Sequence, residues 1–137
     1  MITKTMTYPD FNGKERIEEF NFHLNKAELL ELEASCEGGW SAHVQRIVNS
    51  NDNHKIFYTM KDLILKAYGV KSEDGRRFMK SDEIRRSFEE SPAYEMLLME
   101  LTIDKNAAKN AADFINGIIP KDMPKPDAAP VAIPAAN

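Results

Sequence analysis

Apolar and polar side chains nearly alternate over Ile2–Tyr8, with threonines at every second position. This two-residue period predicts a strand that buries one face. Asn12-Gly13 follows, a dipeptide that favours a tight hairpin turn. A second strand is expected over Glu15–Leu24, so that a hairpin covers about residues 2–24. Because an isolated hairpin is only marginally stable in water, its aromatic side should pack on another part of the chain.

Helical spacing replaces this alternation from about residue 25. Asn25 is a candidate N-cap, and Glu28 completes a pair typical of a capping box. The helix that they begin should end near Gly38-Gly39. Trp40 lies at the start of a second, shorter helix, which the polar run 49–53 should end.

The third helix has the clearest pattern, a continuous apolar stripe made of Ile56, Phe57, Met60, Leu63, Ile64, Ala67 and Tyr68. Gly69 stands where a glycine C-cap is expected. Ser81 is predicted to start a fourth helix, and Ser91-Pro92 a fifth. A last helix should cover about Lys105–Ile119.

The composition changes near residue 120. Five of the seven prolines, with five alanines, lie in residues 120–137, which predicts a disordered tail or linker. The expected fold is therefore mainly α with a small N-terminal β-hairpin, an α+β arrangement. We expect one domain over residues 1–119, with a compact helical bundle over about 25–119.

Overall composition points to an ordinary globular chain, with 42% hydrophobic and 29% charged residues. The formal net charge of −4 disfavours wholesale binding to nucleic acid. Cys36 is the single cysteine, so no intrachain disulfide can form. Neither a signal peptide nor a membrane-spanning apolar segment is visible, and a cytoplasmic location is expected.

Candidate catalytic and metal-binding residues lack the spacing that such sites require. Cys36 is interpreted as a small core residue, and no spacing links it to the histidines, which are expected at the surface: His23, His43 and His54. The acidic runs are expected to be solvated helix faces. Ser72–Gly75 resembles only a fragment of a calcium loop. No catalytic residue, metal ion or cofactor is predicted.

Residues 71–86 form a basic segment with a local net charge of +2, and its basic residues are Lys71, Arg76, Arg77, Lys80, Arg85 and Arg86. Three interpretations stay open for this basic segment: a solvated surface, a contact with protein, or a contact with nucleic acid. A DNA-reading role would need a recognition helix with flanking phosphate contacts, which the segment does not show.

The run Tyr94–Leu101 has apolar side chains at six of eight positions, more than one buried helix face needs. Either this helix is central in the bundle or part of it meets a partner, for which flexible methionine side chains are well suited. The candidate partner-binding residues are Tyr94, Met96, Leu98 and Met99 here, and Arg76, Arg77, Arg85 and Arg86 in the basic segment.

Three segments together resemble the tail assembly chaperones of long-tailed bacteriophages: NFHLNKAELLELE (21–33), KDLILKAYGVKSEDGRRFMKSDEI (61–84) and AADFINGIIP (111–120). The resemblance implies a non-enzymatic protein of the host cytoplasm, absent from the mature virion. It also implies binding to the tape measure protein and recruitment of tail tube subunits. Self-association is expected on another ground, because the basic segment could attract the acidic remainder of a neighbouring copy. The stretch 69–81 resembles a connector between two helices that members of this family share. The Pro/Ala tail resembles the linker after which a ribosomal frameshift adds a second domain in many members.

A small phage-encoded regulator that binds nucleic acid through residues 71–86 is the alternative. A salt-dependent shift in electrophoretic mobility would distinguish the two functions.

Overall fold

An antiparallel hairpin begins the chain in the computed structural model, which describes residues 1–120. Strand β1 (Ile2–Pro9) pairs with β2 (Glu15–Phe22) along its whole length. Gly13 takes a positive φ of 82° in the turn, where its N–H bonds to the Asp10 carbonyl at 2.9 Å. The hairpin predicted from the alternation and from Asn12-Gly13 is confirmed, although β2 ends two residues before Leu24.

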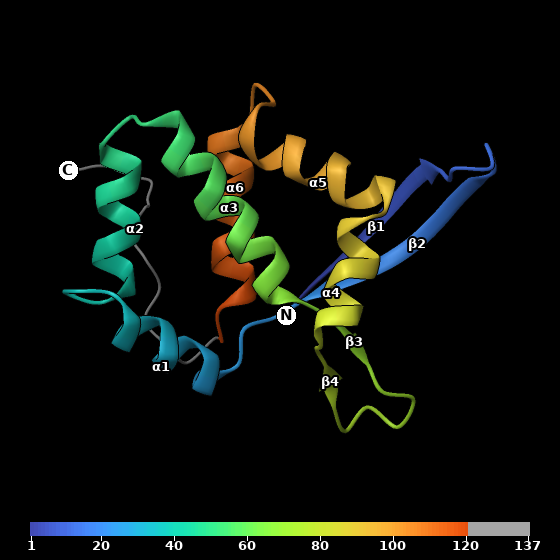
Figure 1. Ribbon diagram of the computed structural model, residues 1–137, viewed down its shortest axis with the longest axis horizontal. Coiled ribbons are helices and arrows are strands. Elements are labelled where there is room, and N and C mark those ends of the chain that lie inside the picture. The colour runs from blue at the N-terminus through green and yellow to red at the C-terminus, as the bar shows by residue number, and fades with distance from the viewer. Residues whose placement is uncertain (121–137) are drawn as a thin grey trace.

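Three helices follow: α1 (Lys26–Ser35), α2 (Trp40–Asn49) and α3 (Asn53–Ala67). The predicted capping box is present, because the Asn25 side chain accepts from the Glu28 N–H while the Glu28 carboxylate accepts from the Asn25 N–H. In α3 the predicted stripe faces the core through Met60, Leu63 and Ile64. These three helices reach the end of the molecule opposite the hairpin tip (Figure 1).

The connector after α3 differs from the prediction. Residues 69–81 were expected to form a turn between helices with Gly69 as C-cap, but α3 ends at Ala67 and Tyr68–Lys71 forms strand β3. Strand β4 (Phe78–Met79) pairs with β3, and β3 pairs with the end of β2 through Phe22 and Tyr68. The result is a four-stranded antiparallel sheet in the order β1-β2-β3-β4.

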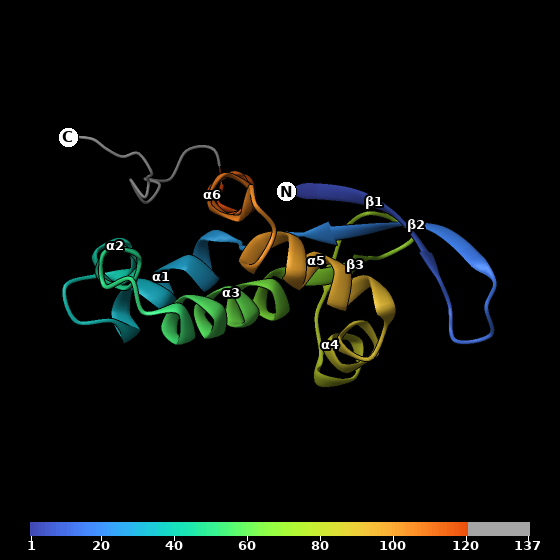
Figure 2. The same cartoon turned by 90° about the horizontal axis from the view of Figure 1, so that it is seen from above.

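The remaining helices are α4 (Asp82–Glu89), α5 (Pro92–Thr102) and α6 (Ala107–Ile118). Ser81 and Ser91 cap α4 and α5 by accepting from the Ile84 and Tyr94 N–H groups, as their positions predicted. In Figure 2, α5 lies between α6 and α4, and it also packs on α3. Six helices and a small sheet confirm the predicted mixed fold, while the predicted tail over 120–137 lies, from residue 121 on, outside the described residues.

The core forms where the sheet meets the helices. Phe22 is fully buried, and its ring centroid lies 5.4 Å from that of Phe114 on α6 and 5.7 Å from that of Phe88 on α4. Tyr68 stacks on Phe88 with centroids 4.3 Å apart. Aromatic pairs in such geometries add to the free energy gained by burying apolar area. The aromatic side of the hairpin thus packs on the helices, as its marginal stability in isolation required.

Candidate partner-binding surfaces

An exposed apolar stripe lies on α5 and just beyond it. Met96 and Met99 are 41% and 49% exposed, and Ile103, the residue after the helix, is 67% exposed. Their i, i+3, i+7 spacing places them on one side of the helix. We call Met96, Met99 and Ile103 the α5 stripe. Large apolar side chains gathered on one exposed side are typical of a protein-binding surface.

The opposite side of α5 supplies the core. Ala93, Leu97 and Leu101 are buried, so the helix is apolar on two sides because it packs inward and also exposes a stripe. Tyr94 is only 9% exposed and belongs to the core, and Leu98 is partly buried against it. Of the four α5 candidates from the sequence, Met96 and Met99 are therefore exposed, Leu98 is partly buried and Tyr94 is buried.

The basic segment is divided among different environments. Arg76 and Arg77 are exposed in the β3–β4 turn, which Asp74 shapes by accepting from the Arg76 N–H at 3.0 Å. Arg85 and Arg86 are exposed on α4, where Arg85 forms an ion pair with Asp82. The arginines of the segment therefore lie on two different elements, the β3–β4 turn and α4.

Lys80 does not join this surface, because its side chain turns inward. Its ammonium is within hydrogen-bonding distance of the carbonyl oxygens of His23 and Lys66, each at 2.8 Å, and of both Glu28 carboxylate oxygens at 2.8 and 2.9 Å. Burial lowers the pKa of Lys80, while the hydrogen bond and the negative charge of Glu28 oppose that shift. Lys80, the residue after β4, thus ties this part of the chain to α1, to the end of α3 and to the chain after β2.

His23 is part of the same region and is partly buried, although the sequence predicted a surface position. Its Nδ1 atom is buried without a hydrogen-bond partner in the described structure. The imidazole meets the Phe78 ring edge to face, with centroids 6.1 Å apart. Burial lowers the pKa of His23, and the positive charges of the N-terminus and of Lys80 lower it further.

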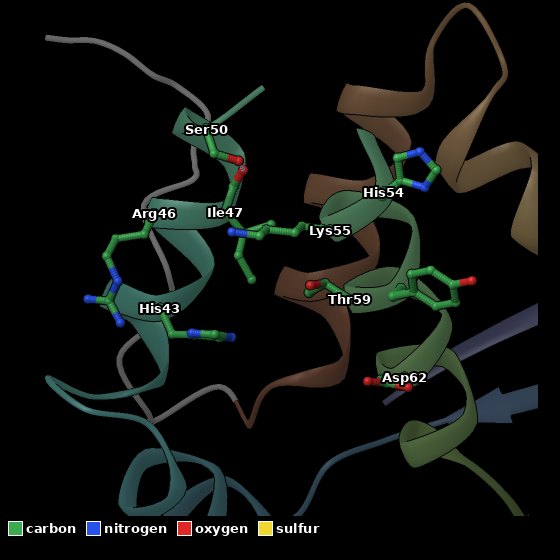
Figure 3. Close-up of a pocket in the computed structure, with 9 residues that line it drawn as sticks. His43, Arg46, Ile47, Ser50, His54, Lys55, Thr59 and Asp62 are labelled. Carbon is green, nitrogen blue, oxygen red and sulfur yellow. Dashed lines mark hydrogen bonds between the residues drawn. The ribbon is translucent and has the colours of Figure 1, made fainter. Parts of the chain in front are cut away.

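A groove of about 500 Å³ lies between α2 and α3. Figure 3 shows His43 and Arg46 on the α2 side, with Lys55, Thr59 and Asp62 on the α3 side. Arg46 also donates to the Glu37 carbonyl at 3.1 Å. The groove is open and lined by mixed side chains, with no paired nucleophile and base among them.

Residues 1–120 hold neither a candidate metal site nor a candidate membrane-spanning helix. No cluster of three or more His, Cys, Asp or Glu side chains there is placed to hold a metal ion. None of the described helices has the length and apolar character needed to cross a bilayer. Cys36 is partly buried and packs against the core, in agreement with its interpretation as a packing residue.

Sequence reasoning missed the Lys80 contacts and the partial burial of His23, whose Nδ1 atom is enclosed. A lysine in a basic run predicts solvation, and nothing in the spacing of Glu28 and Lys80, 52 positions apart, indicates contact. The capping-box role of Glu28 was visible, but its second role depends on the position of β4.

Comparison with protein families found that the family described as phage tail assembly chaperone matches residues 1–132. Comparisons with curated proteins and with solved structures gave no match. The matched region covers nearly all of the chain and includes every helix and strand described above. It also includes the three segments whose resemblance indicated the same family. The chain belongs to the phage tail assembly chaperone family.

Proposed function

We propose that this chaperone binds the tape measure protein, keeps it soluble, and helps to recruit tail tube subunits while the tube polymerises. The protein acts in the host cytoplasm and leaves before the virion is mature. The observation that supports this proposal is the α5 stripe on a chain of the tail assembly chaperone family. Assembly roles in this family do not call for a catalytic centre.

The α5 stripe is suited to bind apolar helix surfaces reversibly. Methionine side chains adapt to varied apolar surfaces because the thioether chain is unbranched and flexible. Complete burial of one such side chain is worth about 1.5–3 kcal/mol, so that two or three together give a modest affinity per copy. Many copies along one long partner would strengthen binding through effective concentration.

Release then needs no nucleotide hydrolysis. Tube subunits that contact the tape measure protein more strongly in total would displace weakly bound chaperones one at a time. Arg76, Arg77, Arg85 and Arg86, all exposed, are proposed to contact acidic partners or neighbouring copies through charge. The net charge of −4 keeps the free chaperone from associating nonspecifically with nucleic acid.

Co-expression with the tape measure protein of the same phage tests the proposal. The wild-type chaperone should raise the soluble fraction of the tape measure protein several-fold. Met96→Glu/Met99→Glu should lower it to the level without chaperone, because two carboxylates would have to be desolvated at the contact. Ala108→Glu/Asn116→Glu adds the same two charges to exposed positions of α6 and should keep wild-type activity.

The proposal fails if the wild-type protein leaves the tape measure protein insoluble, or if the α5 and α6 variants behave alike. The regulator alternative is tested by electrophoretic mobility across a salt series, in which a nucleic-acid-binding protein loses affinity steeply as salt rises. We expect no shift in the mobility of nucleic acid, because the exposed arginines lie on two different elements and the Lys80 side chain turns inward.

A further inference from the structure

Strand β1 forms one edge of the sheet. It is eight residues long, it pairs with β2 on one side, and no other strand of residues 1–120 lies on its other side. Figure 2 shows the N-terminal part of β1 at the margin of the molecule, with its start beside α6 and its length away from α4. An edge of this length is a template for pairing with another strand.

The hydrogen bonds around the hairpin reveal which β1 groups point outward. The Asp10 N–H bonds to the Lys14 carbonyl at 2.8 Å, and the His23 N–H bonds to the Ala67 carbonyl, away from β1, at 2.8 Å. Along an antiparallel ladder, the backbone N–H and C=O groups of successive residues point alternately to the two sides of the strand. The backbone groups of odd-numbered β2 residues therefore point away from β1, and those of even-numbered residues point toward it. The β1 residues opposite the odd-numbered ones are Thr3, Thr5 and Thr7, and their backbone N–H and C=O groups therefore point outward.

A side-chain contact supports this assignment of which β1 backbone groups point outward. Thr3 and Asn21 are directly opposite each other, and the Thr3 Oγ1 atom donates to Asn21 Oδ1 at 2.7 Å. Side chains approach closely in this way in pairs that do not exchange backbone hydrogen bonds. The backbone groups of Thr3 are thus free of β2 and available at the edge.

The usual protections of an edge strand are missing from the interior of β1. Natural edges carry outward charges, prolines or bulges. The single charged residue of β1, Lys4, is drawn inward by an ion pair with Glu100 on α5, and the single proline, Pro9, stands at the end. By contrast, β4 has only two residues, and the free side of β2 presents Glu15 and Glu19.

We propose that two copies of this chain pair through β1, antiparallel about Thr5, into one continuous sheet. Thr5 then lies opposite the partner's Thr5, and Thr3 opposite the partner's Thr7. Each of these pairs exchanges two backbone N–H···O bonds, so the outward groups of all three threonines are satisfied. Opposed threonines are favourable strand neighbours and carry no like charges.

Self-complementarity is the reason to favour a second copy over an extended segment of another protein. The register about Thr5 keeps both faces of the sheet consistent, with threonines on the solvent face. On the core face Lys4 lies opposite the partner's Met6, so the two lysines do not oppose each other. A foreign segment would need the same alternation to meet this edge without burying a charge.

The pairing also affects the α5 stripe. Glu100, which contacts β1 through Lys4, follows Met96 by four residues and precedes Ile103 by three, so the stripe adjoins the β1 side of α5. A two-fold axis perpendicular to the sheet keeps both α5 helices on one face. If the proposed function holds, the dimer presents two stripes on the same face to the tape measure protein.

Analytical ultracentrifugation of the purified full chain, over a concentration series, tests the pairing without any tape measure protein. The wild type should form a dimer. Hydrogen exchange at the Thr3, Thr5 and Thr7 amides should slow as the fraction of dimer rises with protein concentration. Thr5→Pro should weaken dimerisation at least tenfold, because it removes an outward N–H without removing a β1–β2 bond. Thr5→Val retains the N–H and should dimerise as the wild type does.

A second pair of variants keeps the test decisive if Thr5→Pro fails to fold. Thr3→Lys/Thr7→Lys opposes lysines across the edge and should give a monomer with an unchanged circular dichroism spectrum. Ile17→Lys/Glu19→Lys adds lysines to the solvent face of β2, away from the edge, and should still dimerise.

Three results would overturn the inference: a wild-type monomer at every concentration, a dimer that survives Thr3→Lys/Thr7→Lys, or dimerisation only after deletion of residues 121–137. Protection of the three threonine amides only when tape measure protein is added would assign the edge to that partner instead. Because sedimentation and solubilisation are measured separately, failure of the dimer and failure of the proposed function are distinguishable.

Discussion

Lys80, the residue after β4, and Glu28 on α1 form an ion pair, with Lys80 Nζ 2.8 Å from Glu28 Oε2. The side chains are only 23% and 26% exposed, and the same ammonium also lies 2.8 Å from two backbone carbonyl oxygens. A single cation therefore joins two stretches that are far apart along the chain, one that contains His23 and Glu28 and one that contains Lys66 and Lys80. We expect this contact to stabilise the fold.

Lys80→Met should destabilise the protein by about 1–3 kcal/mol, because it leaves the Glu28 carboxylate and two carbonyls without this donor. Urea unfolding followed by circular dichroism measures the change. Lys109→Met removes the exposed pair with Asp113 and should cost no more than about 0.5 kcal/mol. Equal losses in the two variants would show that the Lys80 network contributes no more than a surface pair.

Stability should fall as the pH is lowered from about 7.5 to 5.5, in part because of His23. Burial holds the pKa of His23 in the folded protein below its ordinary value near 6.5, so the unfolded chain takes up the proton first. The stability that the neutral imidazole provides is present above the unfolded pKa and is lost as the pH falls through the folded pKa. Urea midpoints measured across this range should show the slope.

His23→Phe should flatten that slope while keeping a ring against Phe78. His54→Phe, at an exposed position, controls for the loss of an imidazole. An unchanged slope in His23→Phe would assign the pH dependence to other groups.

Gly69→Ala should destabilise the β3–β4 hairpin by about 1–3 kcal/mol. A Cβ atom at Gly69 would lie 2.6 Å from Cε2 of the Phe78 ring, too close without displacement of the ring. The double variant Gly69→Ala/Phe78→Leu should lose less than the sum of the two single variants, since the smaller side chain makes room. Additive losses in thermal unfolding would contradict this close approach.

Asn25→Ala should cost about 1 kcal/mol by removing the α1 cap, in which Asn25 Oδ1 accepts from the Glu28 N–H at 2.8 Å. Asn106 stands at the start of α6 but makes no side-chain cap bond, so Asn106→Ala should change the free energy of unfolding by a few tenths of a kcal/mol. If the two alanine variants lose equal stability, the capping box is not the cause.

Local rules accounted for much of the fold. The β1–β2 hairpin, the stripe of α3 and the starts of α1, α4 and α5 each depend on neighbours within a few residues, which periodicity and capping residues record. The prediction failed at Gly69, because a glycine after a helix suits both a C-cap and a strand. Gly69 lies in a strand because it pairs with β2, a segment more than 40 positions away.

The candidate partner-binding surface was also predicted only in part from the sequence. By itself, the sequence determined that α5 has more apolar side chains than one buried face needs, and that the chain is of the phage tail assembly chaperone kind. Only the tertiary structure decided that Tyr94 is buried while Met96 and Met99 are exposed, that Lys80 turns inward, and that the edge of β1 is left open. Helix and strand periods state which residues share a side, but which side meets the core depends on contacts between distant segments.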